Sequence, residues 1–267
     1  MMKIGVLGKI TKVKNEKTIN ELVGYLRGLG YETRLFSTSS EIADVDVVVI
    51  LGGDGAILHN AVHAAQNGVK IIGINYGNLG FLTEYEKDEW QEIKNLLARL
   101  EQNECRIVKR SILQIQAFGK TYFALNEVAL QRDYANKQTT QIMRVNVETN
   151  EGKDVIAGDG VLICTPTGST AYSLSAGGAI LTPEVPVFML TPVCAFSMRR
   201  RPTVFSDNET FKLSIQRGRS LLVIDGLAVG VLGENEEICV QKAPFTADFP
   251  VRNSADFFNK VRSKLSE

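Results

Sequence analysis

The sequence predicts an α/β domain followed by an antiparallel β domain, because the hydrophobic periodicity changes after about residue 104. In the first hundred residues, short apolar runs alternate with apolar residues at helical spacing, which predicts a parallel sheet with crossover helices. From residue 105 onward, short runs with a period near two follow one another between turn signals, as is typical of antiparallel strands. The last segment, 254–265, is again helical and must dock on another part of the chain, because so short a helix is marginally stable alone.

The N-terminal region is expected to alternate strands and helices. The apolar runs place strands at 3–7, 33–36, 45–51 and 69–74. The run 45–51 is almost continuously apolar, as expected of a strand buried on both faces. Apolar residues at helical spacing place helices at 19–29, 57–65 and 90–100, and Asp88 is expected to cap the last of these. In the final helix, Phe257, Phe258, Val261 and Leu265 share one face, which predicts an apolar docking surface.

The C-terminal region is expected to consist mainly of strands joined by turns. The runs place strands at 107–117, 122–130, 142–148, 155–165, 187–193, 211–215, 221–224 and 238–240. Arg217-Gly218 and Asp225-Gly226 are turn signals between them. Gly119-Lys120-Thr121 resembles the end of a Walker A loop, but Gln114 stands where that loop has its first glycine. We therefore interpret Gly119-Lys120-Thr121 as a hairpin turn.

The composition is that of a folded protein in a reducing compartment. Of 267 residues, 44% are apolar and 22% are charged, and 30 basic residues balance 30 acidic ones. A net charge of zero argues against a protein that coats nucleic acid or a membrane surface. The four cysteines form no Cys-x-x-Cys pair and are expected in the core, which favours the cytoplasm. The N-terminus does not resemble a signal peptide, and the longest apolar stretch is too short to span a membrane.

Gly52-Gly53-Asp54-Gly55 directly follows the apolar strand at 45–51 and directly precedes a helix. Glycines at the carboxyl end of a strand let backbone N–H groups approach phosphate oxygens, and a helix N-terminus favours anions. An aspartate in such a site is costly unless it accepts a proton from a hydroxyl or holds a metal ion. The alternative is a tight turn in which Asp54 only caps the next helix.

Three further segments have compositions typical of ligand-binding loops. The segment 73–82 contains three glycines after a strand, so its backbone can approach a ligand closely. The side chains of Asn126 and Glu127 can each accept a hydrogen bond from a ribose hydroxyl. The segment 158–178 concentrates hydroxyls and small residues after a strand, and its Tyr172 can stack on a base.

Taken in this order, the four segments resemble those of the NAD kinase family, and the resemblance spans about residues 45–225. The unbroken segment TPTGSTAYSLSAGG, 165–178, is its most specific part, because the related lipid kinases share GGDG. The resemblance implies a Rossmann-like α/β domain (1–104), a β-sandwich domain (105–245) and a C-terminal segment (246–267) that returns to the first domain. It also implies a homodimer or homotetramer in the cytoplasm.

The activity implied by the resemblance is transfer of the γ-phosphoryl group of ATP, or of polyphosphate, to the 2′-hydroxyl of the adenosine ribose of NAD, which yields NADP. Mg²⁺ is expected with the triphosphate, held mainly by the nucleotide. Asp54 would be the general base on that hydroxyl, and the phosphate loop would comprise Gly52, Gly53 and Gly55. The implied NAD-binding residues are Asp54, Gly55, His59, Asn126, Glu127, Asp159, Thr170, Ala171, Tyr172, Ser173, Leu174 and Ser175.

Within this set, the family pattern assigns different parts of NAD to different residues. Asn126 and Glu127 would hold the nicotinamide-side ribose, and Asp159 would line the nicotinamide end. The adenine and nearby groups would meet Thr170, Ala171, Tyr172 and Ser175.

Several positions depart from the family pattern or stay open. Ala56 and Leu227 replace residues that are usually polar, which leaves the contacts to the phosphoryl donor and the second substrate undecided. His59 and His63 share a helical face, but Asn60 stands where a zinc protease has glutamate, so no metal site is expected. The run Arg199-Arg200-Arg201 is either solvated surface or a phosphate contact.

Two other functions remain as alternatives. A GGDG lipid kinase would not need the Asn126-Glu127 pair or the segment 165–178. A non-catalytic regulator that binds NAD or NADP would not need Asp54. The sequence leaves open whether NADH is also a substrate.

Overall fold

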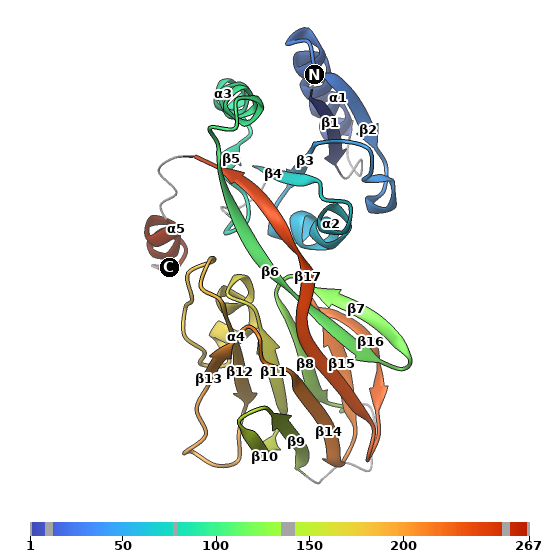
Figure 1. Cartoon of the computed structure of the whole chain (residues 1–267), viewed down its shortest axis with the longest axis vertical. Coiled ribbons are helices and arrows are strands. Elements are labelled where there is room, and N and C mark those ends of the chain that lie inside the picture. Colours follow the sequence, from blue (N-terminus) through green and yellow to red (C-terminus); the bar gives the residue numbers. More distant parts are fainter. Residues whose placement is uncertain (1, 9–12, 77–79, 135–141, 253–256, 266–267) are drawn as a thin grey trace. The chain divides into compact units, whose positions relative to one another are not determined.

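The computed structural model describes residues 2–8, 13–76, 80–134, 142–252 and 257–265. The chain forms two compact units. Unit 1 comprises Met1–Lys109 and Phe245–Glu267, and unit 2 comprises Arg110–Pro244. The chain enters unit 2 within strand β6 (Arg106–Ala117) and returns to unit 1 within strand β17 (Glu237–Val251) (Figure 1).

Unit 1 contains a five-stranded parallel sheet in the order β2-β1-β3-β4-β5. Its strands are β1 (Lys3–Gly8), β2 (Glu32–Phe36), β3 (Val47–Gly52), β4 (Lys70–Asn75) and β5 (Tyr85–Glu86). The five residues Val47–Leu51 of β3 are all buried, which confirms the prediction of a strand covered on both faces. The strand order changes direction between β1 and β3, and ligands bind at such a point in open α/β sheets.

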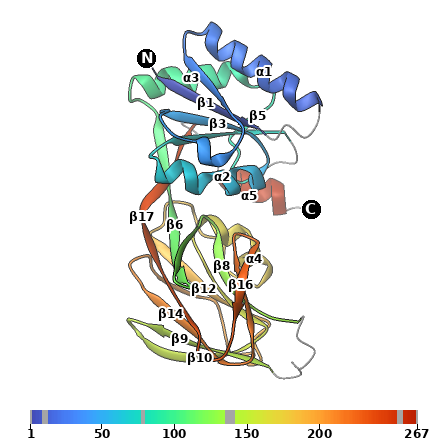
Figure 2. The ribbon, with the colours of Figure 1, turned by 90° about the vertical axis from the view of Figure 1, so that its right-hand side faces the viewer.

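Helices cover both faces of this sheet (Figure 2). On one face lie α1 (Val13–Gly28) and α3 (Trp90–Glu101), whose buried residues, such as Leu26 and Leu96, share one apolar cluster with Val49 of β3. On the other face, α2 (Asp54–Gln66) packs closely against β4. A Cβ added to Gly73 there would lie 2.3 Å from the Ile57 side chain. A short 3-10 helix, η1 (Ser39–Glu41), follows β2.

The C-terminal helix α5 (Phe257–Leu265) is part of unit 1, so the C-terminal segment returns to the α/β domain as expected. The predicted apolar docking face is wrong at Phe258 and Leu265, which are 67% and 45% exposed, whereas its other two residues, Phe257 and Val261, are partly buried. Lysine side chains dock this helix instead. The predicted cap of α3 is also wrong, because the N-cap residue is Glu89 and not Asp88.

Unit 2 is built on two six-stranded sheets. One has the order β10-β9-β14-β17-β6-β7 and the other the order β13-β12-β11-β8-β15-β16. The further strands are β7 (Lys120–Ala124), β8 (Glu127–Arg132), β9 (Met143–Thr149), β10 (Gly152–Gly158), β11 (Gly160–Cys164), β12 (Val187–Val193), β13 (Thr203–Ser206), β14 (Phe211–Arg217), β15 (Ser220–Ile224) and β16 (Leu227–Leu232). Buried residues of both sheets, such as Phe188 and Phe211, form one apolar core. The predicted fold class, α/β followed by a β-sandwich, is confirmed.

Two segments predicted as single strands are each two strands. The run 122–130 is interrupted between β7 and β8, and the run 155–165 between β10 and β11. Asn126 lies at the first interruption and Asp159 at the second. Both are predicted site residues, so the irregular backbone occurs where ligand contacts are expected. Strands β13 and β16 were not predicted from the sequence, and each carries an exposed apolar side chain, Val204 and Leu227 respectively.

Two predicted turns have the backbone conformation that two-residue hairpins need. Phe118 and Gly119, between β6 and β7, have φ of 51° and 68°. Asp225 and Gly226, between β15 and β16, have φ of 46° and 78°. Positive φ at both central positions matches the right-handed twist of the flanking strands. Gly119 therefore belongs to a hairpin, as predicted, and not to a phosphate-binding loop.

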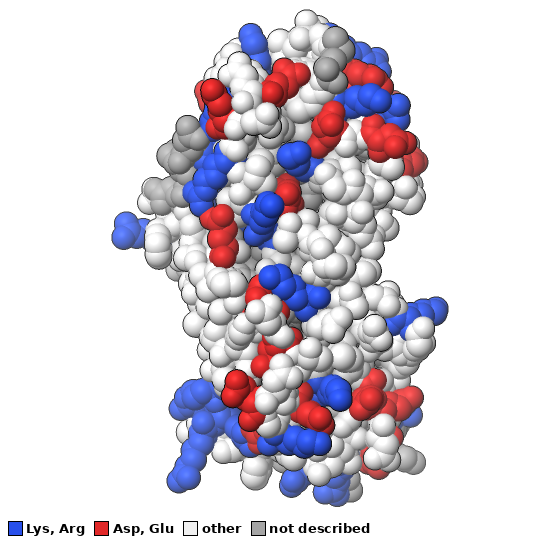
Figure 3. Space-filling view, in the orientation of Figure 1, with Lys and Arg blue, Asp and Glu red and all other residues white. Residues whose placement is uncertain are grey.

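Charges of both signs are mixed on the surface shown in Figure 3, and the cysteines differ in burial. Basic and acidic side chains are interspersed on the face shown in Figure 3. No helix in the described part of the chain is long and apolar enough to cross a bilayer. Cys164 is buried as expected, but Cys194 is exposed, so the expectation of core cysteines is wrong there.

Candidate functional site

Asp54 lies at the carboxyl end of β3 as the first residue of α2. The N-cap position belongs to Gly53, so the alternative in which Asp54 caps the helix is wrong. Instead, the carboxylate accepts a hydrogen bond at Oδ2 from the backbone N–H of Phe81 (2.8 Å) and one at Oδ1 from that of Leu82 (2.9 Å). Two backbone donors, one to each oxygen, fix the orientation of the carboxylate.

Gly80 allows this arrangement because no side chain would fit at its position. A Cβ added there would lie 2.1 Å from Asp54 Oδ1 and 2.5 Å from Thr83 Oγ1. The glycine-rich segment predicted as a ligand loop thus packs its backbone on Asp54. Residues 77–79 of that segment lie outside the described residues.

A third group on the carboxylate comes from the far end of the sequence. The Nζ atom of Lys264, on α5, lies 3.4 Å from Asp54 Oδ2. The two side chains are 22% and 33% exposed, so the pair is largely shielded from solvent. Nothing in the local sequence around either residue predicts this contact.

Two adjoining hollows open at the carboxyl ends of β1 and β3, where the strand order changes direction. The larger has a volume of about 570 Å³, and Ser37–Ser39, Gly55 and His59 line part of it. The smaller, of about 250 Å³, is lined by Gly52 and Gly53 together with Tyr76 and others. Gly8, Leu51 and Ala56 line both hollows.

The predicted phosphate loop and His59 therefore line the same pair of adjoining hollows in unit 1. Gly55 and His59 are exposed, and His59 lies one helical turn after Gly55 on α2. The amide of Asn60 donates to the carbonyl oxygen of Ala56 (2.6 Å), so it is engaged within the helix. Free backbone N–H groups at the start of α2 and the adjacent glycines give this space the chemistry of an anion site.

In unit 2, a single carboxylate organises the loop that carries Asn126 and Glu127. Asp225, in the β15–β16 turn, accepts hydrogen bonds from three consecutive backbone N–H groups. The donors are Leu125 (2.8 Å), Asn126 (2.8 Å) and Glu127 (3.0 Å). The sequence identifies Asp225 as a turn residue and does not reveal these contacts, because the partners lie about a hundred residues away.

Glu127 is buried beside this carboxylate, with 7% of its surface exposed. Burial raises the pKa of its carboxyl group from 4.5 to about 7, and the negative charge of Asp225 acts on the pKa in the same direction. Its Oε2 atom is buried and has no hydrogen-bond partner among the described residues. A buried polar atom without a partner is costly, so Oε2 is suited to a ligand hydroxyl.

The segment at 165–178 packs directly on Asn126. The backbone N–H of Thr165 donates to the carbonyl oxygen of Asn126 (2.9 Å), and the Thr165 hydroxyl donates to that of Leu125 (2.6 Å). A Cβ added to Gly168 would lie 2.2 Å from the Asn126 carbonyl oxygen. The structure therefore brings this segment and the Asn126-Glu127 pair together, as one loop cluster of unit 2.

Within this segment, a 3-10 helix, η2 (Thr167–Thr170), and a short helix, α4 (Tyr172–Ser175), determine which side chains are accessible. Ser173 is fully buried, and its hydroxyl is 3.0 Å from that of Thr191, so only its backbone could meet a ligand. Ser175 is exposed, whereas Thr170, Ala171, Tyr172 and Leu174 are partly buried.

Asp159 lies near the aromatic part of this cluster. Its Oδ1 atom is 3.5 Å from Nη1 of Arg132, whose guanidinium lies over the Tyr134 ring at 5.3 Å from the centroid. Burial raises the pKa of Tyr172, and nearby negative charges, Asp159 among them, raise the pKa further. The positions predicted for the two ends of NAD are thus near each other in unit 2.

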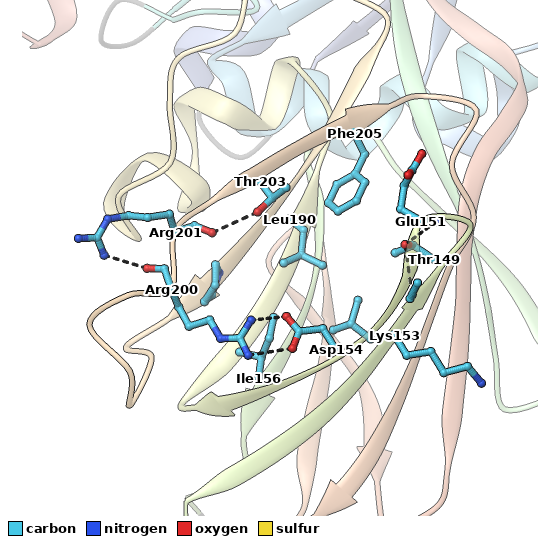
Figure 4. A pocket seen from close by; sticks show the side chains of 13 residues that line it. Thr149, Glu151, Lys153, Asp154, Ile156, Leu190, Arg200, Arg201, Thr203 and Phe205 are labelled. Carbon is cyan, nitrogen blue, oxygen red and sulfur yellow. Dashed lines mark hydrogen bonds and ion pairs between the residues drawn. The ribbon is translucent and has the colours of Figure 1, made fainter.

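Two arginines of the basic run at 199–201 bind other groups of unit 2 with their side chains. Arg200 forms a bidentate ion pair with Asp154 of β10, beside a hollow of about 300 Å³ between β10 and strands β12 and β13 (Figure 4). Arg201 donates to the backbone carbonyl oxygen of Met198. Both guanidinium groups are therefore engaged within unit 2.

The described residues contain no group of three or more histidine, cysteine or acidic side chains that could hold a metal ion. Asp54 offers carboxylate oxygens beside the glycine loop, and Mg²⁺ in phosphoryl-transfer sites takes one or two carboxylates together with substrate phosphates. These residues fit a metal ion that arrives with a nucleotide, and they do not form a metal site of their own.

Family models match both parts of the chain. Residues 5–105 match the ATP-NAD kinase N-terminal domain, and residues 125–250 match the ATP-NAD kinase C-terminal domain. Together with the fold, these matches define a two-domain kinase. The chain is 30% identical to an NAD kinase of Methanothermobacter thermautotrophicus, over 100% of this chain and 97% of that protein. It is 34% identical to an NAD kinase of Christiangramia forsetii, over 86% and 79% of the two chains. The chain therefore belongs to the NAD kinase family.

Solved structures agree with this assignment. An NAD kinase from Archaeoglobus fulgidus in complex with ATP has a TM-score of 0.78 and 28% identity, over 98% of this chain and 99% of that one. Yeast NADH kinase complexed with NADH has a TM-score of 0.84 over 99% and 88% of the two chains, and at 20% identity this likeness concerns the fold.

Proposed function

We propose that the protein is an enzyme that transfers the γ-phosphoryl group of ATP to the 2′-hydroxyl of the adenosine ribose of NAD and so makes NADP. Membership of the NAD kinase family, shown by relatives matched over the whole chain, supports this activity. The observation in the structure that carries it is the Asp54 carboxylate, held by two backbone N–H groups at the head of α2 beside the glycine loop.

Asp54 acts as the general base. Each carboxylate oxygen has lone pairs beyond the one that accepts a backbone hydrogen bond, so it can also accept the proton of the acceptor hydroxyl. The rigid hold on the carboxylate means that no reorientation is needed when the proton moves. General-base catalysis of this kind contributes ~10²–10⁴-fold to the rate.

The phosphoryl donor binds in the two adjoining hollows of unit 1. Gly52, Gly53 and Gly55 and the N-terminus of α2 bind the phosphates, and His59 lines the same space. Mg²⁺, when bound with the triphosphate, neutralises part of its charge. Ala56 offers no hydroxyl to this metal ion, so the phosphates, water and the Asp54 carboxylate would hold it. Replacing ATP by polyphosphate in the activity assay tests whether polyphosphate also serves as the donor.

NAD binds to the loop cluster of unit 2. Asn126 and Glu127 hold a ribose diol, because the buried Oε2 of Glu127 has no hydrogen-bond partner among the described residues. Tyr172 offers a partly buried ring for stacking, and Asp159 lies near it. Thr170, Ala171, Leu174 and Ser175 line the adenine side, and Ser173 contributes its backbone.

The proposal also includes the domain boundaries, the cellular compartment and the oligomeric state. The two domains join near residue 104 and near residue 245. The enzyme works in the cytoplasm, which is consistent with its unpaired cysteines. It assembles as a homodimer or homotetramer, for which size-exclusion chromatography with light scattering is the test.

The activity is tested by incubating purified protein with NAD, ATP and Mg²⁺ and measuring NADP with an NADP-specific dehydrogenase. Asp54→Asn should lower kcat by ~10²–10⁴-fold and leave the Kd for NAD unchanged, because the amide keeps the shape but accepts no proton. Asp44→Asn, at an exposed position of the same unit that lines neither hollow, serves as the matched control. Near-normal turnover of Asp54→Asn would overturn the role of Asp54, and no NADP from the wild-type protein would overturn the activity.

A further inference from the structure

Helix α5 brings a lysine onto the carboxylate that acts as the base. Nζ of Lys264 lies 3.4 Å from Asp54 Oδ2 and 4.5 Å from the centroid of the Phe81 ring. Phe81 is also the residue whose backbone N–H donates to Oδ2. The ammonium group and this backbone donor therefore share one carboxylate oxygen.

A second lysine holds α5 in place independently of Lys264. Nζ of Lys260, one helical turn earlier, donates to the carbonyl oxygen of Thr83 (3.0 Å) and pairs with Glu84 Oε2 (2.7 Å). Residues four apart lie on the same face of a helix, so both lysines face the loop that also supports Asp54. Loss of the Lys264 side chain should therefore leave α5 docked.

The distances from the Asp54 carboxylate to its three donors distinguish tightly bound partners from a loosely bound one. The backbone donors are 2.8 and 2.9 Å from the carboxylate, which is the range of strong charge-assisted hydrogen bonds, whereas Lys264 at 3.4 Å is beyond it. The backbone holds the carboxylate, and the ammonium group is the loosely bound partner. Because Lys264 is mostly buried, its charge needs another anion when the carboxylate is neutralised.

We propose that Lys264 is a catalytic residue that exchanges partners during the reaction, from Asp54 in the free enzyme to the transferred phosphoryl group. This inference rests on the proposed function. The 2′-oxygen forms a bond to the γ-phosphorus, the bond from that phosphorus to the bridging oxygen breaks, and its electron pair leaves with ADP. The hydroxyl proton goes to Asp54, which loses its negative charge.

Lys264 keeps its own protons throughout this step. Once Asp54 is neutral, the ammonium group has no other ion-pair partner among the described residues, so its charge is available to the negative phosphoryl oxygens. Phosphoryl transfer depends mainly on positioning and on neutralisation of this charge. The exchange brings the Lys264 ammonium group to the negative phosphoryl oxygens when the 2′-hydroxyl loses its proton to Asp54.

The test compares Lys264→Met and Lys264→Arg with Arg262→Met, which removes the same charge from an exposed position of the same helix. Lys264→Met should lower kcat by ~10²-fold or more, the usual cost of one group that stabilises transition-state charge. Its KM for NAD and its melting temperature should stay near those of the wild type. Lys264→Arg should recover part of kcat, and Arg262→Met should keep it.

A double-mutant cycle distinguishes a catalytic role that Lys264 shares with Asp54 from a purely structural role of Lys264. If the two residues act in one step, Lys264→Met should cost much less in an Asp54→Asn background than in the wild type. The proposal is overturned if kcat of Lys264→Met stays within roughly threefold of the wild type. A rise in kcat would also overturn it and would identify a blocking contact. A fall in melting temperature without rescue by arginine would identify a purely structural lysine. Wild-type protein that makes no NADP would refute the proposed function instead.

Discussion

Replacement of Glu127 by glutamine should remove a large pH dependence from the stability of unit 2. In the folded protein, burial raises the pKa of Glu127 from 4.5 to about 7, with Asp225 as the second cause. In the unfolded chain the carboxyl group has its ordinary pKa near 4.5. Between these two values the folded state keeps a proton that the unfolded state has released, so stability falls as the pH rises.

The size of this effect follows from the difference between the two pKa values. A pKa that differs by one between the folded and unfolded states corresponds to ~1.4 kcal/mol, so Glu127 destabilises the fold by at most about 3 kcal/mol above pH 7 and by nothing below pH 4.5. Glutamine has nearly the same shape and never ionises. The difference in unfolding free energy, Glu127→Gln minus wild type, should therefore grow by about 2.5 kcal/mol from pH 5 to pH 8.

Urea unfolding followed by circular dichroism at several pH values, without nucleotide, measures this difference. Taking the difference between variants cancels the other titrating groups. Glu148→Gln is the control, because Lys153 lowers the pKa of that exposed carboxyl group and its loss should give no gain at high pH. A Glu127→Gln difference that stays flat between pH 5 and pH 8 would refute the conclusion that Glu127 holds a proton in the folded state.

Three more substitutions test other parts of the site. Asp225→Ala should lower the unfolding free energy by about 3–5 kcal/mol and weaken NAD binding, because three backbone N–H groups lose their acceptor; Asp225→Asn should lose less, and equal stability of the alanine variant would contradict the anchoring role. Gly80→Ala should lower kcat by ~10²-fold, since its Cβ would displace the Asp54 carboxylate. Gly24→Ala, where an added Cβ meets nothing within 4 Å, is the matched control for kcat. Tyr172→Ala should raise the Kd for NAD measured by calorimetry by about tenfold, through loss of a stacking surface, and an unchanged Kd would count against stacking.

The order of the main elements could be predicted from local patterns because each depends on residues near in sequence. The strands at 45–51 and 187–193 and the hairpin at Asp225-Gly226 are where the periodicity and the turn residues placed them. The breaks at Asn126 and Asp159 were missed, although the polar pair Asn126-Glu127 and the glycines on either side of Asp159 interrupt the apolar runs there. The local sequence does not show what holds the first break, because Asp225 binds its backbone from about a hundred residues away.

The candidate site likewise has parts that the sequence reveals and parts that it does not reveal. The glycines around Asp54 and the hydroxyl-rich segment are contiguous, so the sequence reveals them as motifs. The groups that hold Asp54 are not contiguous with it: Phe81 and Leu82 lie 27 and 28 residues away, and Lys264 lies 210 residues away. No local pattern relates such residues, since only the packing of the loop and of α5 brings them to one carboxylate.

Composition and periodicity were therefore enough to predict the fold class, and the resemblance of the contiguous motifs indicated the family and the residue types available for phosphoryl transfer. Periodicity and motifs involve residues near in sequence, so they can be recognised along the chain. The tertiary structure alone decided that Asp54 is held by backbone N–H groups and a lysine, that Glu127 is buried with a raised pKa, and that Ser173 faces the interior. Each of these depends on desolvation or on a contact between residues far apart in sequence, and both arise only when the chain packs.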